Sequence, residues 1–408
     1  MENTPTKLHG YPSAFRALRN PQFRALWIAF LVSSVGTWMQ IVAQSLLILR
    51  LAHGSALALG CVSLSQAAAF FLFALPGGGI ADRIDRRRLL IATQTSLMLV
   101  AVLLGFLTYT SMVTVPIVAG LAFLSGMILS VDQPARGALV SALVPHSELL
   151  GAISLQSAVF NGAAIVGPAL AGILVPAVGV AAVFFLNGVS FIGMLAALAS
   201  LPRGLNPPRP RERLLSQIEE GLRSVHGDPT LVSALAIYGM LLFAGPSLQL
   251  LLPVLALDRL HVGAASLGLL FSAAGSGSVL GALLSGSLPA PTMRGIRAAA
   301  VCWCAALAVA GAGVTVAVTF AALVVLGTSQ TVVAAATSAL LQSRVPAQQR
   351  GRVMSLNTLL LMGVRPLGDF PASALIAAAG PPFAAIASAG AVAAVALFAG
   401  RHSRGSKL

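Results

Sequence analysis

The chain has 408 residues, of which 57% are hydrophobic and only 9% are charged. A soluble domain carries about 25% charged residues, so this composition excludes soluble domains, and its apolar content excludes a disordered chain. Lys and Arg outnumber Asp and Glu by 25 to 11, which gives a formal net charge of +14. The composition predicts a polytopic membrane protein whose excess of cations must be explained by where they lie.

Twelve stretches of the sequence are long and apolar enough to cross a bilayer as helices. A bilayer core about 30 Å thick needs roughly 20 apolar residues in helical conformation. The runs are too long, and alternate too little, to be the strands of a barrel. The expected spans are residues 25–49, 56–80, 89–109, 113–132, 151–175, 178–200, 231–256, 264–287, 297–315, 317–340, 353–377 and 382–400. We expect no cleaved signal peptide, because the first apolar run is longer than a signal core and no cleavage motif precedes a polar mature start.

The basic residues fix the expected orientation of these spans. Twenty-two of the 25 Lys and Arg residues fall in the two tails or in connections on the same side as the tails. Arg50 and Arg259 fall on the other side, and Arg365 falls within a span. The positive-inside rule therefore predicts that both termini are cytoplasmic. The net charge then reflects topology beside anionic lipid, which argues against a nucleic-acid partner.

The two halves of the sequence repeat each other. At an offset of 201 residues, several Pro, Gly and Ala positions recur in order: Pro145 and Pro346, Gly162 and Gly363, Gly167 and Gly368, Ala171 and Ala372. Chance similarity between apolar helices explains ordered Pro and Gly matches poorly. Because six spans is an even number, the halves face the same way, as two parallel-repeat bundles related by an axis along the membrane normal.

The predicted fold is therefore an all-α polytopic membrane protein with twelve transmembrane helices in two six-helix bundles. The expected divisions are a cytoplasmic tail (1–24), the first bundle (25–201), a cytoplasmic linker with an amphipathic helix (202–230), the second bundle (231–400) and a cytoplasmic tail (401–408).

The connection between the second and third spans carries a motif of glycines and charges, Pro76-Gly77-Gly78-Gly79-Ile80-Ala81-Asp82-Arg83-Ile84-Asp85-Arg86-Arg87-Arg88. Glycines let two helices end and approach closely, and a carboxylate here can face a helix N-terminus. The segment resembles the signature loop of the major facilitator superfamily, G-x-x-x-D-R-x-G-R-R, on whose positions fall Gly78, Asp82, Arg83, Arg86 and Arg87. Asp85 replaces the second glycine, a form similar to the macrolide-efflux and enterobactin-exporter-like branch.

The resemblance implies a major facilitator fold with a conformational switch. In the superfamily the signature Asp and Arg belong to a charge network that keeps the cytoplasmic side closed in the outward-open state. We expect this role for Asp82 and Arg83, with Asp132 and Arg136 at the end of the fourth span as nearby partners. The alternative is that these charges only end the helices and set topology.

Two further features bear on the transport pathway. Gly167, Pro168 and Gly172 in the fifth span resemble the antiporter signature G-P-x-x-G-G, with Ala171 in place of one glycine, and weakly favour export. In the first span, the spacings of 4, 3 and 4 place a polar stripe on one helical face, made of Ser33, Thr37, Gln40 and Gln44. Such a stripe either lines a wet cavity or bonds to a neighbouring helix. The remaining polar pathway candidates are Asn161, Tyr238 and Gln330.

The eleventh expected span carries the clearest intramembrane charges, Arg365 and Asp369. An ionised side chain at depth costs at least about 2.5–3.5 kcal/mol on insertion scales, and a spacing of four lets the two side chains meet and offset each other. We expect Asp369 to lie close to the far surface, nearly solvated. The functional interpretation is an anion or substrate contact by Arg365, with Asp369 as its partner or as a protonation site. Asp132 is the other candidate for proton coupling, and a self-neutralising structural pair is the alternative.

Catalysis has little support in the sequence. All six histidines lie in tails or connections, and no metal-ligand cluster or phosphate-binding loop is found, so we expect no enzyme, no cofactor and no metal. The sequence predicts a monomeric secondary transporter of the bacterial cytoplasmic membrane, whose partners are a small-molecule substrate, protons and membrane lipid, with no nucleic acid. The favoured function is proton-coupled efflux of a small amphiphilic compound (drug, siderophore or secondary metabolite) by rocker-switch alternating access. The alternatives are an importer or lipid flippase of the same fold and, from another class, a membrane sensor or assembly protein that does not transport.

Overall fold

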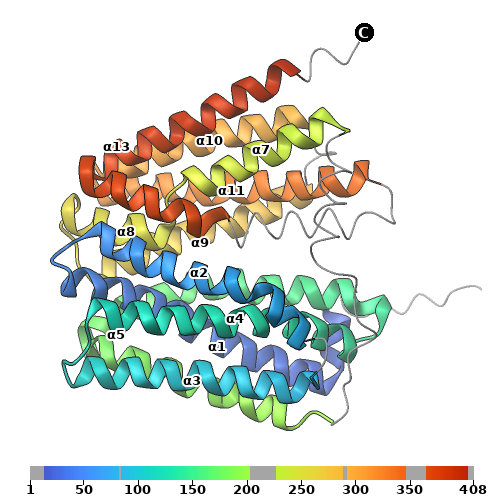
Figure 1. Cartoon of the computed structure of the whole chain (residues 1–408). Helices are drawn as coiled ribbons and strands as arrows, with labels where there is room; N and C mark the ends of the chain where they lie inside the picture. The colour runs from blue at the N-terminus through green and yellow to red at the C-terminus, as the bar shows by residue number, and fades with distance from the viewer. Residues whose placement is uncertain (1–12, 82–83, 203–226, 288–291, 346–363, 403–408) are drawn as a thin grey trace, which may run out of the picture.

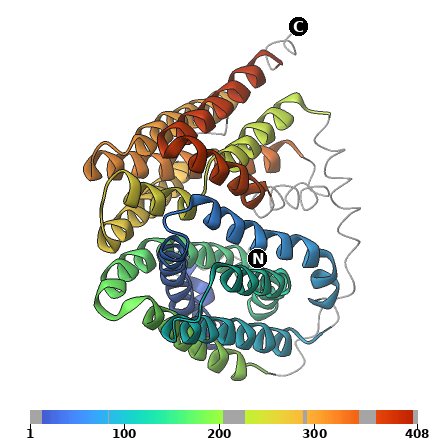
Figure 2. The same ribbon diagram turned by 60° about the vertical axis from the view of Figure 1, so that its left-hand side comes forward.

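The structure is a computed structural model, and it describes residues 13–81, 84–202, 227–287, 292–345 and 364–402. Its helices run roughly side by side in two bundles, one from each half of the chain (Figure 1). A view turned by 60° shows the same division, with the helices of the second half stacked above those of the first (Figure 2). The expected linker helix and the pair Asp82 and Arg83 lie outside the described residues.

The first bundle is formed by the elements of the first half of the chain. In chain order they are η1 (Ser13–Arg19), α1 (Pro21–Leu51), α2 (Ala56–Ala81), α3 (Arg86–Tyr109), α4 (Val115–Leu143), η2 (His146–Glu148) and α5 (Leu149–Ala199). The second bundle contains α7 (Pro229–Ala244), α8 (Leu248–Asp258), α9 (Ala264–Ser287), α10 (Met293–Ala312), α11 (Val316–Arg344) and α13 (Arg365–His402).

Within the described residues, nine helices are long and apolar enough to cross a membrane, or ten when α7 and α8 are taken as one span. Two of these helices are too long for one crossing. The 51 residues of α5 and the 38 of α13 rise about 77 and 57 Å, against a bilayer core of about 30 Å. Each breaks at a glycine with positive φ, Gly179 (φ 84°) and Gly380 (φ 81°), a conformation that a Cβ disfavours. The described residues thus hold nine or ten membrane-length helices, and the two breaks are compatible with the twelve crossings that the sequence predicts.

The seventh expected span is not one continuous helix. It is divided into α7 and α8, which meet at an angle of 42°. The break falls at Gly245-Pro246-Ser247, where proline cannot continue the hydrogen-bond ladder of the preceding turn. The backbone N–H of Ser247 is therefore available to a partner outside its own helix.

Contacts within the first bundle recur in the second, which is the structural form of the sequence repeat. A Cβ on Gly126 of α4 would overlap the carbonyl oxygen of Gln66 in α2, and a Cβ on Gly327 of α11 would overlap that of Ala274 in α9. Gly126 and Gly327 are 201 residues apart, as are the breaks at Gly179 and Gly380. Equivalent glycines therefore make the same close helix contacts and the same helix breaks in both halves, as expected of a duplicated bundle.

The helix starts repeat as well. Asn20 caps α1 by accepting a hydrogen bond from the backbone N–H of Gln22 (2.9 Å), and its amide donates to the carbonyl of Leu143 at the end of α4 (2.8 Å). Asp228 likewise caps α7, accepting from the backbone N–H of Thr230 (2.8 Å), and pairs with Arg344 at the end of α11 (3.0 Å).

The charge state of Asp228 follows from these contacts. Partial burial raises the pKa of Asp228, but the hydrogen bonds from Arg344 and Thr230 and the charge of Arg344 outweigh it, so its pKa lies below the usual value. Asp228 is therefore ionised near neutral pH.

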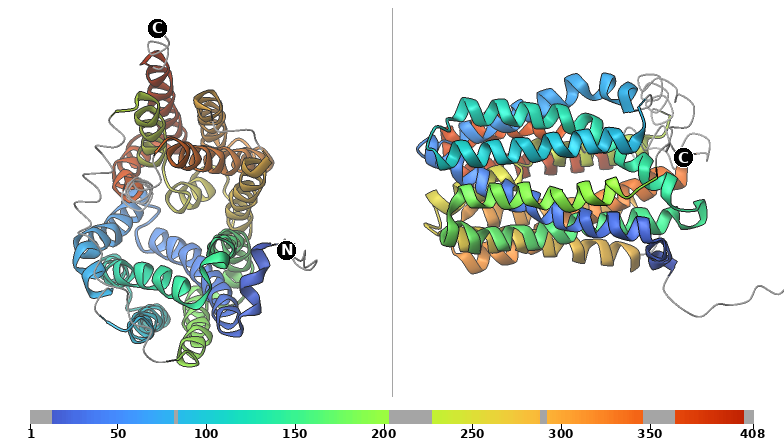
Figure 3. Two further views of the ribbon diagram at one scale, coloured as in Figure 1. Left: turned by 90° about the vertical axis from the view of Figure 1, so that its right-hand side faces the viewer. Right: turned by 90° about the horizontal axis from the view of Figure 1, so that it is seen from below.

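The two ends of the molecule differ in charge. We call one end of the molecule the basic end (Figure 1). It holds η1, the first residues of α1, α3, α7 and α10, and the last residues of α4, α11 and α13. Its described arginines are Arg16, Arg19, Arg24, Arg86, Arg87, Arg88, Arg136, Arg294, Arg297, Arg344 and Arg401. The opposite end holds Arg50 and Arg259. Seen nearly along the helices, and from below, both described chain ends lie at the basic end (Figure 3).

Candidate functional site

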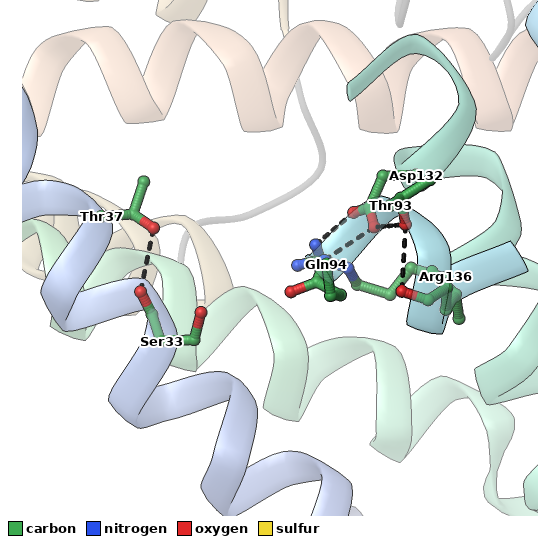
Figure 4. Close-up of polar contacts among 7 residues, drawn as sticks. Ser33, Thr37, Thr93, Gln94, Asp132 and Arg136 are labelled. Atoms are coloured by element: carbon green, nitrogen blue, oxygen red, sulfur yellow. Dashed lines mark hydrogen bonds and ion pairs between the residues drawn. The ribbon is translucent and has the colours of Figure 1, made fainter. Parts of the chain in front are cut away.

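A buried carboxylate, Asp132, organises a polar cluster near the basic end of the first bundle. Its side chain is fully buried and accepts hydrogen bonds at one oxygen from the Thr93 hydroxyl and the Gln94 amide, each at 2.7 Å. Its other oxygen is paired with Arg136, one helical turn further along α4. Figure 4 shows these side chains converging from α3 and α4. The cluster thus ties α3 to α4 through one negative charge.

Arg136 joins this cluster to α1. Its guanidinium carbon lies 4.6 Å from the ring centroid of Phe30, within the range of a cation–π interaction. The side chain is 21% exposed, so it reaches from the buried carboxylate toward the basic end. Asp132 and Arg136 are therefore a pair, while their expected contact with Asp82 and Arg83 concerns residues outside the described part of the chain.

The described part of the signature loop caps helices. Asp85 accepts a hydrogen bond from the backbone N–H of Arg88 at the start of α3 (3.0 Å). Arg87 donates to the carbonyls of Leu198 (2.8 Å) and Ala199 (2.7 Å) at the end of α5. Arg86 is buried, and Gly78 lies in the last turn of α2. These contacts fit the helix-ending role that was the alternative to a switch, and they leave the switch role untested.

The most informative carboxylate is Asp369, because it joins both bundles. One oxygen accepts a hydrogen bond from the hydroxyl of Ser63 in α2 (3.0 Å), and the other accepts from the backbone N–H of Ser247 at the break between α7 and α8 (2.8 Å). Beside it, a Cβ on Gly60 of α2 would overlap the side chain of Ser373 in α13. We call this contact of α2, α8 and α13 the Asp369 seam.

Two expectations about Asp369 are wrong. It is not nearly solvated near the far surface: it is 4% exposed and lies 11 residues before the Gly380 break, about 16 Å of helix rise from the opposite end. Nor does it form an ion pair with Arg365 among the described residues: the hydrogen bonds to its two oxygens come from Ser63 and Ser247. Spacing of four made a pair possible, but the freed N–H at the helix break competes for the carboxylate.

Arg365 is left with an unsatisfied donor. Its Nε is buried without a hydrogen-bond partner, while the residue as a whole is partly exposed. It acts electrostatically on Asp369 and on Tyr238 of α7, so its charge is felt at the seam. Tyr238 itself is 3% exposed.

The polar stripe of α1 is only partly a free surface. Gln40 accepts a hydrogen bond from the amide of Asn187 in the second part of α5 (2.7 Å), and Thr37 donates to the carbonyl of Ser33 (2.9 Å). Ser33 is buried, whereas Thr37 is exposed and Gln44 is partly exposed. The stripe therefore combines the two interpretations that the sequence left open: one residue bonds to a neighbouring helix, and others remain accessible.

The antiporter-like motif lies where α5 meets α9. A Cβ on Gly172 would come within 2.9 Å of the carbonyl of Ala264, and the hydroxyl of Ser272 donates to the carbonyl of Ile165 (2.6 Å). Gly167 instead packs against α1, at Trp38. The motif thus supplies a second close contact between the bundles, at Pro168 and Gly172.

The remaining polar candidates are less informative. Asn161 donates to the carbonyl of Ser157 in its own helix (2.9 Å) and is partly exposed. Gln330 of α11 is partly exposed. Among the described hydrogen bonds, none joins Asn161 or Gln330 to a residue of the Asp369 seam.

A family of sequences described as "Transmembrane secretion effector" matches residues 12–404. The chain belongs to this family of major facilitator transporters. The expected superfamily is thereby confirmed, together with the helical fold. Transport is the activity of this superfamily.

Curated relatives of this chain include proteins named as exporters. The chain is 29% identical over 274 residues to the enterobactin exporter EntS of Citrobacter koseri, and equally to that of Shigella boydii serotype 4. The match covers 66% of this chain and 64% of each exporter, so it spans less than two thirds of the relatives' length.

Solved structures share the fold at low identity. A bacterial homologue of the human lysosomal transporter Spinster, in an inward-facing and unoccupied conformation, gives a TM-score of 0.73 at 16% identity, covering 94% of this chain and 97% of that one. A bacterial homologue of the iron transporter ferroportin, in an inward-facing state, gives 0.70 at 16% identity, covering 93% and 98%.

Sequence reasoning missed the partners of the transporter's candidate residues. Thr93, Gln94 and Asn187 are buried polar residues in apolar spans, a pattern that could have marked them. Ser63 gave no signal, because serine is common in membrane helices. Gly245 and Pro246 before Ser247 could have indicated the break between α7 and α8, but not that a carboxylate accepts a hydrogen bond there.

Proposed function

We propose that this transporter exports a small amphiphilic compound, of drug, siderophore or secondary-metabolite type, by proton-coupled alternating access of its two bundles. Family membership supports secondary transport, and the relatives named enterobactin exporters support outward direction. The glycines and proline that pack α5 against α9 add weaker support for export.

The orientation in this proposal follows from the charged ends. Eleven described arginines lie at the basic end and two at the other, so the basic end faces the cytoplasm by the positive-inside rule. Both tails are then cytoplasmic, in a bacterial inner membrane, and residues 25–201 and 231–400 form the two moving bundles. The protein acts as a monomer, because each chain contains both bundles.

The observation that carries the proposal is where the two bundles meet. The Asp369 seam, the α5–α9 contact, and a hydrogen bond from Ser45 of α1 to the carbonyl of Gln249 in α8 (3.4 Å) lie from the middle of the membrane toward the opposite end. The ribbons diverge toward the basic end (Figure 1). The contacts between the bundles support a state closed to the outside, one of the two that alternating access requires.

The proposal gives two carboxylates different roles, one at each side of the membrane. Asp132 holds Arg136 at the cytoplasmic end of α4, where, with Asp82 and Arg83, it would close the cytoplasmic side in the outward-open state. Asp369 accepts two hydrogen bonds that hold the outer side closed, and protonation would weaken both, because bonds to a charged acceptor are stronger than bonds to a neutral one. Arg365 is the charged group that acts on Asp369, and it also acts on Tyr238 of α7.

The test is transport in proteoliposomes with and without a pH gradient. Enterobactin is the first compound to try, followed by a panel of amphiphilic drugs. The vesicles are oriented with the cytoplasmic side of the protein facing the lumen. We expect the export of at least one compound from the lumen to rise with an inwardly directed proton gradient. Flux that is independent of the gradient for every active compound would remove proton coupling, and gradient-driven uptake would make the protein an importer.

Asp369→Asn provides the residue-level test, with Asp258→Asn as the matched control. Asp258 is an exposed acid at the end of α8, remote from the seam. We expect Asp369→Asn to keep substrate binding but to lose stimulation by the gradient, while Asp258→Asn behaves as wild type. Equal stimulation in both variants would exclude Asp369 as the coupling site.

A further inference from the structure

Arg365 forms no ion pair in the part of the chain that the structure describes. The residue is partly exposed, and its buried Nε has no hydrogen-bond partner. Its charge acts on Asp369, four residues along the same helix, but the described hydrogen bonds of that carboxylate come from Ser63 and Ser247. A membrane protein retains such a costly group when something else supplies the negative charge.

The position of Arg365 shows where that charge would come from. Positions 365 and 369 are one helical turn apart, so both side chains project from the same face of α13. Asp369 faces the seam with α2 and α8, which closes the path toward the opposite end. Arg365 therefore lies directly on the basic-end side of this closure, next to the path between the bundles, and it is partly exposed there.

The charge of Arg365 also reaches a hydroxyl-bearing side chain on a neighbouring helix. Tyr238 of α7 interacts electrostatically with Arg365, and its ring is buried among apolar residues. A guanidinium offers several N–H donors in a planar fork suited to carboxylate or another oxyanion, and a tyrosine hydroxyl can add one more. An apolar wall with one cation and one hydroxyl suits an organic anion that also carries an aromatic or aliphatic body.

We propose that Arg365 is the binding residue for the negatively charged group of an amphiphilic organic anion, held below the Asp369 seam. The inference rests on the proposed transport function and narrows its substrate class from amphiphiles in general to anionic ones. Arg365 acts by direct contact with the ligand, whereas Asp369 closes the path above it.

The test uses three probes that differ only in charge: dansylglycine (anionic), dansylglycinamide (neutral) and dansyl ethylenediamine (cationic). Binding to the purified full-length protein in neutral-lipid nanodiscs is measured by energy transfer from its tryptophans to the dansyl group, with empty nanodiscs subtracted. We expect dansylglycine to bind at least about tenfold more tightly than the amide, the size of one charge-assisted hydrogen bond, and the cationic probe to bind more weakly than the amide.

The variants assign that preference to one residue. Arg365→Gln should bring dansylglycine to the affinity of the amide while amide binding stays within about twofold of wild type, which also shows that the protein is folded. Arg365→Lys should keep part of the preference. Arg259→Gln, which removes an exposed arginine at the opposite end, should leave all three affinities unchanged.

Three results overturn the proposal: no binding of dansylglycine, no preference for it in the wild type, or a preference that survives in Arg365→Gln. Failure of the transport function looks different. A protein that binds dansylglycine through Arg365 but moves no compound in proteoliposomes refutes export and keeps the anion site, whereas gradient-driven export without charge preference refutes the anion site alone.

Discussion

Removing the carboxylate of Asp132 should destabilise the first bundle by about 3 kcal/mol, the low end of the range for breaking a buried ion pair. Asp132→Ala leaves the Gln94 amide without this acceptor and leaves the Thr93 hydroxyl only the carbonyl of Leu90 (3.2 Å), and these residues are 1% and 7% exposed. Each such hydrogen bond in a membrane protein contributes about 0.6–1.7 kcal/mol. Arg136 loses its partner too, but it is 21% exposed and stacks on Phe30, so its share is about 1 kcal/mol.

The measurement is reversible unfolding in mixed micelles with increasing SDS, followed by tryptophan fluorescence. Asp132→Asn keeps an oxygen for Thr93 and Gln94 and should cost about 1–2 kcal/mol. The double variant Asp132→Ala with Arg136→Ala should cost less than the sum of the two single changes, because both remove the same pair. Asp258→Ala is the control, at about 0.5 kcal/mol or less. If Asp132→Ala lies within 1 kcal/mol of wild type, the cluster does not stabilise the bundle as described.

Three further predictions address packing, pH and orientation. Gly126→Leu should cost at least about 2 kcal/mol in the same titration, because α2 backbone occupies the site, whereas Gly120→Leu, which has open space around it, should cost under about 0.5; equal effects would contradict the packing. The ionised form of Asp228 stabilises the fold above its usual pKa of 3.8, so the difference in Tm between wild type and Asp228→Asn should shrink as pH falls through the lowered pKa, and a constant difference would exclude this linkage. In a cysteine-free background in whole cells, an impermeant maleimide should label Ser111→Cys at the opposite end and should label Ser147→Cys at the basic end only after permeabilisation; the reverse pattern would invert the orientation.

Much of the fold could be predicted from sequence because each helix must satisfy its own backbone in lipid. Apolar length and the distribution of arginines then determine spans and topology. The repeat was visible at Gly167 and Gly368 because close packing of helices tolerates no Cβ there. The break in the seventh span was not predicted, because the apolar length of a segment does not show that backbone hydrogen bonds are lost at Gly245 and Pro246.

The candidate site was harder to predict, because side-chain partners come from distant parts of the chain. Asp132 and Arg136 were expected only as partners of Asp82 and Arg83, and the pair that they form with each other was not predicted. A spacing of four suggested a pair of Asp369 with Arg365, whereas the partners of Asp369 are 306 and 122 residues away in sequence. Spacing describes one helix, whereas the carboxylate responds to every donor that tertiary packing brings to it.

Alternating access is tested most directly by measuring the distances between the bundles at both ends. Spin labels at Arg50→Cys and Asp258→Cys report on the opposite end, and labels at Ser141→Cys and Ser343→Cys report on the basic end; all four residues are exposed, and each pair takes one position from each bundle. Pulsed electron paramagnetic resonance in nanodiscs would compare the resting protein with the protein given a transported compound.

We expect the two distances to change in opposite directions: as the opposite-end distance lengthens, the basic-end distance shortens, in the same fraction of molecules. Distances that stay fixed at both ends, or that lengthen together, would contradict a pair of bundles rocking about a central seam.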